Sequence, residues 1–367
     1  MLISTAVKEE KPMMIHPKAR PLISKLSLPT PIQKYFSNLD WEIDLSNNTN
    51  PYVGGFSEYP DVKQNDLKML YLNRILGINP SPYTSNGTRE VLTFENVLFT
   101  AGSMEGLDLI LRTFAEPNKD VICVTLPSFS AYTHWALIHN LEVKAIPLLG
   151  SNLNLIDEEE IIQLNPKIIF LCDPNNPTGT KLTPEAIQKL CSSLDGFVIV
   201  DEAYIEFSDQ PSSIFYLNKY KNLIILRTFS KAWGLAGVRC GAIIADEPII
   251  NALRYVQLPF SFSSSSQEKV EERLLNPEKT FTSWERIKKN RKEMLEELSN
   301  LGGIAKVFES DTNFIMLVLK DFQKTIHLLN ENKIRVLDCS ASVPNSIRVS
   351  LGTEEQNQKF LEVLRKS

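Results

Sequence analysis

A lysine at position 231 directly follows an apolar, strand-like run in the segment RTFSKAWGLAGVRCG, which covers residues 227–241. Desolvation and cationic neighbours lower the pKa of such a lysine and free its amine, so Lys231 is a candidate nucleophile for forming a Schiff base. Ser230 and Arg239 flank it, and a hydroxyl with a guanidinium suits a dianionic phosphate monoester. The alternative is a solvent-exposed lysine in a glycine-rich turn, so the interpretation depends on its partners.

Two more polar clusters follow apolar runs. Asp201 and Tyr204 belong to DEAY, which closes the run FVIVD. A carboxylate there costs desolvation free energy unless it is paired, and a protonated pyridine nitrogen would be a suitable partner. Asn176 lies in the turn DPNNPTG, where its amide can donate to a phenolate oxygen. A helix-capping aspartate and an ordinary turn are the alternatives.

Two further segments could contact a flat, phosphorylated ligand. Gly102 and Ser103 begin a helical pattern, so backbone amides and the positive end of a helix dipole are available to a phosphate. Ser103 can serve as a plain helix cap at the same time. Phe129 follows the run VICVTL and could lay its ring on a flat cofactor, although most aromatic residues at strand ends belong to the core.

These clusters need a frame that gathers the ends of strands. Between about 95 and 250 the sequence alternates continuous apolar runs with helical patterns, which indicates a mainly parallel sheet in an α/β domain. Ligands of such sheets bind at the carboxyl ends of the strands. The predicted strands cover residues 121–126, 143–148, 167–172, 197–201, 222–228 and 241–246.

A second, smaller domain is expected after the break LPFSFSSSSQ at residues 258–267. A long charged helical pattern to about 300 precedes strands and helices that predict an α+β unit. Its strands are expected at 313–319, 333–337 and 346–350, and its helices at 322–331 and from 353. We therefore predict an N-terminal arm (1–44) packing on the small domain or on a partner subunit, a large domain (45–262) and a small domain (263–367).

The composition excludes several classes of function. The 367 residues are 43% hydrophobic with a formal net charge of −5, and the basic residues are scattered, which argues against a nucleic-acid partner. Charges begin by position 8 and no stretch of about 18 apolar residues exists, so we expect a cytoplasmic protein without a membrane span. The histidine and cysteine spacings predict no metal site and buried, reduced thiols.

Taken in order, the segments from about Asn48 to Gly352 resemble fold-type I pyridoxal-phosphate (PLP) aminotransferases, most closely the histidinol-phosphate aminotransferase family. The resemblance implies an α/β fold-type I architecture, in which a large domain has a mainly parallel seven-stranded sheet and the smaller domain is α+β. It also implies that Lys231 forms the Schiff base with PLP and that Asp201 pairs with the pyridine nitrogen. Tyr204 and Asn176 would hold the phenolic oxygen.

The same resemblance assigns the remaining contacts. Asn50 and Tyr52 lie in a segment similar to the family's N-E-N-P-Y and would bind substrate. Tyr59 would reach the cofactor phosphate of a neighbouring subunit, which implies a homodimer with shared active sites. Arg348 would grip the anionic group of the substrate. The contacts to the phosphate and the stacked ring fall on Gly102, Ser103, Met104 (through its backbone amide), Ser230, Arg239 and Phe129.

The implied activity is a ping-pong transfer from histidinol phosphate to 2-oxoglutarate, giving imidazole acetol phosphate and glutamate, in histidine biosynthesis. Three departures from the family pattern are Thr49 for glutamate, Met104 for a frequent aspartate and Leu337 for a frequent arginine. The last two touch the phosphate and substrate side. An aromatic amino acid aminotransferase and a threonine-phosphate decarboxylase remain alternatives, as does a non-catalytic regulator, which would be expected to lack the lysine.

Overall fold

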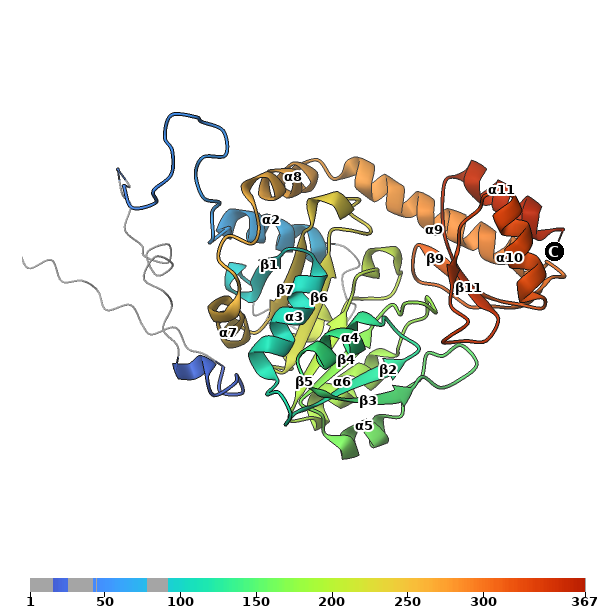
Figure 1. Cartoon of the computed structure of the whole chain (residues 1–367), viewed down its shortest axis with the longest axis horizontal. Coiled ribbons are helices and arrows are strands. Elements are labelled where there is room, and N and C mark those ends of the chain that lie inside the picture. The colour runs from blue at the N-terminus through green and yellow to red at the C-terminus, as the bar shows by residue number, and fades with distance from the viewer. Residues whose placement is uncertain (1–15, 26–41, 44, 78–91, 367) are drawn as a thin grey trace, which may run out of the picture.

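The computed structural model describes residues 16–25, 42–43, 45–77 and 92–366, and these ranges contain a larger and a smaller β-sheet (Figure 1). The larger sheet has the order β1-β7-β6-β5-β4-β2-β3, and the smaller has the order β10-β11-β9-β8. In the larger sheet β2 to β6 pair in parallel, whereas β7 is antiparallel to both β1 and β6. The predicted α/β fold with a mainly parallel seven-stranded sheet is confirmed.

The elements of the large sheet alternate along the chain with the helices that cover it. The strands are β1 (Val97–Thr100), β2 (Val121–Leu126), β3 (Glu142–Pro147), β4 (Ile168–Cys172), β5 (Phe197–Asp201), β6 (Leu223–Thr228) and β7 (Gly241–Ala245). The helices are α2 (Asn65–Leu76), α3 (Ser103–Phe114), α4 (Ala131–Ile138), α5 (Glu158–Leu164), α6 (Pro184–Ser193), α7 (Glu247–Val256) and α8 (Ser264–Leu275). Short 3-10 helices are η1 (Ile23–Lys25), η4 (Phe94–Asn96), η5 (Ile205–Phe207), η6 (Ser213–Tyr216) and η7 (Ala236–Val238).

The central strands are buried on both faces, because helices cover the sheet from two sides. Every residue of β4, β5, β6 and β7 is buried, which explains why these strands are apolar except at the ends of β5 (Asp201) and β6 (Arg227 and Thr228). One apolar core joins the sheet to α2, α5, α6 and α8, and Leu190 is among its members. The other core joins the opposite face to α3, α4 and α7 through residues such as Ile110. The sheet is thereby fixed as a rigid platform.

Among the described residues, the helices of the smaller sheet pack on one of its faces. Its strands are β8 (Ile304–Val307), β9 (Phe314–Leu319), β10 (Leu337–Asp338) and β11 (Ser346–Ser350), and its helices are α9 (Glu278–Ser299), α10 (Phe322–Glu331) and α11 (Glu354–Leu364). Ile347 and Val349 pack into the core under these helices. Because side chains alternate along a strand, Arg348 points to the face opposite Ile347 and Val349.

Helix α9 connects the two sheets. Its Trp284 packs in a core of the large sheet, whereas Met294 packs in the core of the small one. Figure 1 shows α9 running from α8 toward the small sheet. The predicted domain limits at 44 and 262 stay predictions, and most of the predicted arm (1–44) lies outside the described residues.

Some expected elements differ in detail. The strand predicted at 333–337 pairs with β11 only at Leu337 and Asp338. Lys333 belongs instead to the turn after α10, with a left-handed backbone (φ 57°). The long helical pattern after residue 267 divides into α8 and α9 at Pro277, whose missing amide cannot continue a helix. Strand β1 was not predicted. Within the described ranges, no helix combines the length and the apolar character needed to span a bilayer.

A buried ion network stabilises the loops beyond β5 and β6. Arg227, near the end of β6, is 3% exposed and pairs with Glu202 at 2.8 Å and with Glu206 at 3.1 Å. Ser212 donates to Glu202 at 2.7 Å, and the indole of Trp233 donates to Glu206 at 3.2 Å. The network therefore links the segment after Asp201 to the loop that carries Lys231.

Replacing Arg227 by Ala should destabilise the protein by about 3–5 kcal/mol, because two buried carboxylates lose their cation. Urea unfolding followed by circular dichroism measures this loss. Arg365→Ala is the matched control, since Arg365 and Glu297 form an exposed pair at 3.0 Å and such pairs contribute at most about 1 kcal/mol. Equal effects of the two substitutions would contradict a stabilising role for the network.

Candidate active site

A cavity of about 500 Å³ lies at the carboxyl ends of the parallel strands. Ends of parallel strands meet at one edge of the sheet, so segments far apart in the sequence converge there. Most of the residues singled out from the sequence form its wall. They are Ser103, Met104, Phe129, Asn176, Asp201, Tyr204, Ser230, Lys231, Arg239 and Arg348.

One side of the cavity is a cradle for an anion. Gly102 has φ +82° and precedes α3, whose first turn directs backbone amides outward. A Cβ built on Gly102 would lie 2.5 Å from Nη2 of Arg239, so only glycine allows the guanidinium this close. Arg239 Nη1 also donates to the hydroxyl of Ser230 at 3.3 Å. Amides, a hydroxyl and a guanidinium together suit a phosphate.

Asp201 lies on another side of the cavity, at the end of β5. Its Oδ2 accepts a hydrogen bond from the hydroxyl of Tyr132 at 2.7 Å, and its Oδ1 accepts one from the amide of Ala203 at 3.1 Å. Burial raises the pKa of Asp201 to about 6, and these hydrogen bonds act in the opposite direction. The carboxylate is thus ionised at neutral pH and keeps lone pairs for a cationic partner.

Lys231 reaches into the cavity from the loop after β6. Its Nζ lies 5.7 Å from the centre of the Tyr204 ring. Loss of hydration lowers the pKa of Lys231, and the charges of Arg348 and Arg239 lower it further, whereas Asp201 raises it. A larger share of neutral amine is therefore available as nucleophile and base.

Arg348 closes the cavity from the smaller sheet. Its Nη1 donates to Oδ1 of Asn176, and its guanidinium lies 4.8 Å from the centre of the Phe314 ring. Leu337 pairs with Arg348 across β10 and β11, and both line the cavity. Nε of Arg348 is buried without a hydrogen-bond partner among the described residues. The small sheet thus places the guanidinium of Arg348 beside the apolar Leu337, and Asp338 of β10 lines the cavity as well.

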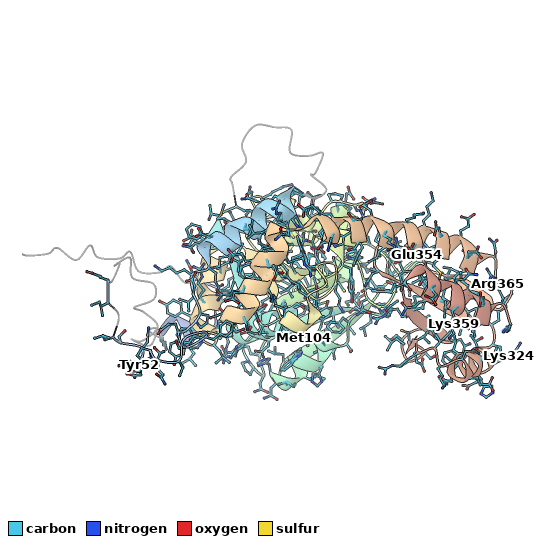
Figure 2. All side chains as sticks on the ribbon, turned by 90° about the horizontal axis from the view of Figure 1, so that it is seen from above. Tyr52, Met104, Lys324, Glu354, Lys359 and Arg365 are labelled. Atoms are coloured by element: carbon cyan, nitrogen blue, oxygen red, sulfur yellow. The ribbon has the colours of Figure 1, made fainter. Side chains whose placement is uncertain are left out.

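Gly102 does not line this cavity but directly precedes Ser103, which does, and three further predicted residues lie away from it. Tyr52 is 94% exposed, and Figure 2 shows it far from Met104, which lines the cavity. The side-chain oxygen of Asn50 accepts a hydrogen bond from the backbone amide of Tyr52 at 3.1 Å. The ring of Tyr59 stacks on Phe260 with ring centres 4.3 Å apart. Their roles in binding substrate and a neighbouring cofactor stay predictions.

Two supporting contacts were missed by sequence reasoning. Tyr132, at the start of α4, donates a hydrogen bond to Asp201, and local spacing gave no signal for this contact across 69 positions. The ion pair of Lys181 with Asp173, at 2.8 Å, fixes the turn that presents Asn176. Neither sequence spacing nor residue type distinguishes that lysine from others.

Comparison with known proteins identifies the family. Residues 43–364 match the family model described as aminotransferase class I and II. The chain belongs to this aminotransferase family. The histidinol-phosphate aminotransferase of Flavobacterium johnsoniae is 33% identical, covering 88% of this chain and 89% of that relative. The predicted resemblance to histidinol-phosphate aminotransferases is confirmed, and this chain is a PLP-dependent aminotransferase.

Solved structures agree on the fold. The histidinol-phosphate aminotransferase from Clostridium acetobutylicum is 24% identical with a TM-score of 0.74, over 85% of this chain and 90% of that chain. The enzyme from Sinorhizobium meliloti in complex with pyridoxal-5'-phosphate is 20% identical with a TM-score of 0.71, over 96% and 98% of the respective chains. The fold-type I architecture of this aminotransferase is thereby supported.

The cavity of this aminotransferase fits PLP. The cofactor carries a phosphate, a pyridine nitrogen and a phenolic oxygen. The wall offers the cradle beside Ser103 and Arg239, the carboxylate of Asp201 and the polar groups of Tyr204 and Asn176. In addition, Ser128 lines the cavity, and its buried Oγ has no hydrogen-bond partner among the described residues. An unsatisfied hydroxyl at this place is expected where a polar ligand binds.

Replacing Gly102 by Ala should weaken PLP binding by about tenfold or more, because the new Cβ displaces Arg239 and strains a positive φ. Titration of the apoenzyme with PLP, followed by quenching of tryptophan fluorescence, measures the affinity. Gly302→Ala is the control, since a Cβ there meets open space. Unchanged affinity in Gly102→Ala would contradict the cradle.

Proposed function

We propose that this aminotransferase moves the amino group of histidinol phosphate to 2-oxoglutarate, giving imidazole acetol phosphate and glutamate, as in histidine biosynthesis. The observation that carries the proposal is Arg348, a cavity guanidinium set apart from the cradle, whose Nε has no partner among the described residues. Histidinol phosphate has no carboxylate, so its phosphate would be the anion that Arg348 binds. The name of the Flavobacterium johnsoniae relative supports the same amino donor.

Lys231 is the residue that we assign to the chemistry. Its neutral amine would hold the cofactor and would be freed when the amine of the substrate takes its place. The bound cofactor supplies an electron sink for the charge that develops at the substrate Cα. The freed Nζ then removes the proton from Cα, and its lowered pKa favours the neutral form needed for this step.

The remaining residues bind and orient. Asp201 would keep the pyridine nitrogen protonated, while Tyr204 and Asn176 would bind the phenolic oxygen. Arg348 contacts Asn176 as well as lining the substrate side, so substrate and cofactor binding are joined at one contact. The ring of Phe129 would lie on the cofactor.

We also propose a cytoplasmic homodimer with shared active sites. Tyr59 is 51% exposed and does not line the cavity of its own chain. An aromatic ring held by stacking on Phe260 is preorganised to contact another subunit. Asn50 and Tyr52 are exposed on the same segment and would approach the substrate there.

Adding single amino donors to the purified enzyme and following the visible absorbance of its cofactor tests the reaction. Histidinol phosphate should give the fastest half-reaction, ahead of phenylalanine and threonine phosphate, and its amino group should appear in glutamate after 2-oxoglutarate is added. Lys231→Ala should lack the visible band of the resting enzyme and should not respond. A faster response to phenylalanine, or release of CO2 from threonine phosphate, would contradict the proposal.

Leu337→Arg should raise kcat/KM for histidinol phosphate relative to phenylalanine by about tenfold, because a second guanidinium beside Arg348 favours a dianionic group. Steady-state kinetics with both donors give the ratio. Leu275→Arg adds the same charge at an exposed position at the end of α8 and is the control. An unchanged ratio would mean that the Leu337 position does not select the donor.

A further inference from the structure

Tyr132 places a buried hydroxyl on the carboxylate of Asp201. The residue is 0% exposed, and its oxygen lies 2.7 Å from Oδ2 of Asp201. Burial holds the pKa of Tyr132 well above its ordinary value, so the phenol stays protonated. An ionised carboxylate can only accept, and therefore Tyr132 must donate.

The position of this hydroxyl is fixed by packing of the ring. The Tyr132 ring stacks on Phe170 with centres 5.1 Å apart and an angle of 1°. It also meets Phe129 edge-on at 5.7 Å, and Phe129 lines the cavity. A phenylalanine at this position would keep both contacts, so the effect of the hydroxyl can be separated from that of the ring.

Several titratable groups surround Asp201. Glu202, directly after the end of β5, raises its pKa, and Lys231 from the loop after β6 lowers it. Cys172 at the end of β4 and Tyr204 are also close enough for Asp201 to raise their pKa values. Among these neighbours, the hydroxyl of Tyr132 has the largest effect that favours the ionised carboxylate.

We propose that Tyr132 is a positioning residue, whose hydroxyl holds Asp201 as an anion aimed at the pyridine nitrogen of the cofactor. One oxygen of Asp201 is held by Tyr132 and the other by the amide of Ala203, so the carboxylate has one fixed orientation. Lone pairs remain for a proton on the cofactor nitrogen. The inference rests on the proposed pairing of Asp201 with the cofactor and is independent of the amino donor.

The hydrogen bond from Tyr132 to Asp201 sets the pH range in which the apoenzyme binds PLP tightly. Below the pKa of Asp201, about 6, the carboxyl is neutral and no longer attracts the protonated ring nitrogen, so affinity should fall as the pH falls through this value. Removing the hydroxyl of Tyr132 raises that pKa, because the ionised form loses a donor. The loss of affinity should then begin at a higher pH.

The test is titration of apoenzyme with PLP between about pH 5 and pH 8, followed by tryptophan fluorescence. In Tyr132→Phe the midpoint should move upward by about one pH unit, since a hydrogen bond to a charged group is lost. If Tyr132→Phe fails to fold, Tyr132→Leu replaces it in the test. It also lacks the hydroxyl, so its midpoint should move upward too. Tyr220→Phe, which removes a hydroxyl 3.5 Å from Gln188 on another face, should match the wild type.

Asp201→Asn separates the two hypotheses. If it binds PLP with the pH dependence of the wild type, Asp201 does not pair with the cofactor and that part of the proposed function fails. If Asp201→Asn loses the pH dependence while folded Tyr132→Phe or Tyr132→Leu keeps the wild-type midpoint, the positioning role of Tyr132 is overturned. A purely structural role for Tyr132 would lower stability without moving the midpoint.

Discussion

The organisation of this site depends on keeping one carboxylate charged inside the protein. Asp201 ends a strand whose other residues are wholly buried and apolar, so its ionised form loses most of its hydration. The structure compensates with two hydrogen bonds, from Tyr132 and Ala203, and with the nearby cation of Lys231. In the proposed function a protonated ring nitrogen would be the last partner of the carboxylate, which would join cofactor affinity to the geometry of β5.

The same constraint accounts for the polar network behind the sheet edge. Glu202 follows Asp201 directly, and left unpaired it would make the carboxylate harder to ionise. Arg227 from β6 pairs with Glu202 and with Glu206, and Glu206 in turn binds the indole of Trp233. Trp233 lies two residues after Lys231, so the same ion network that neutralises Glu202 and Glu206 also holds the loop that carries Lys231. Charge balance and loop position are set by one arrangement.

Much of the frame and of the cofactor side could be predicted from local sequence. Strands such as β2 and β5 are unbroken apolar runs, and the polar motifs that follow them must meet because parallel strands share one edge. Strand β1 was missed because four residues give too short a pattern. The contact of Tyr132 with Asp201 spans 69 positions, and which buried phenol meets which carboxylate depends on helix packing that spacing does not encode.

The substrate side is different because another sheet builds it. Arg348 and Leu337 come from β11 and β10, and their pairing depends on an antiparallel register in the small sheet. Arg348 reaches Asn176 across 172 positions, so the contact depends on how the two sheets are joined by α9. A substitution at Leu337 would change which amino donor fits beside Arg348, and it would leave Asp201 and Lys231 in place. In the proposed function, chemistry and donor choice therefore belong to separate parts of the fold. The motifs that identify the chemistry do not identify the donor, whose selection would depend on the register of β10 and β11.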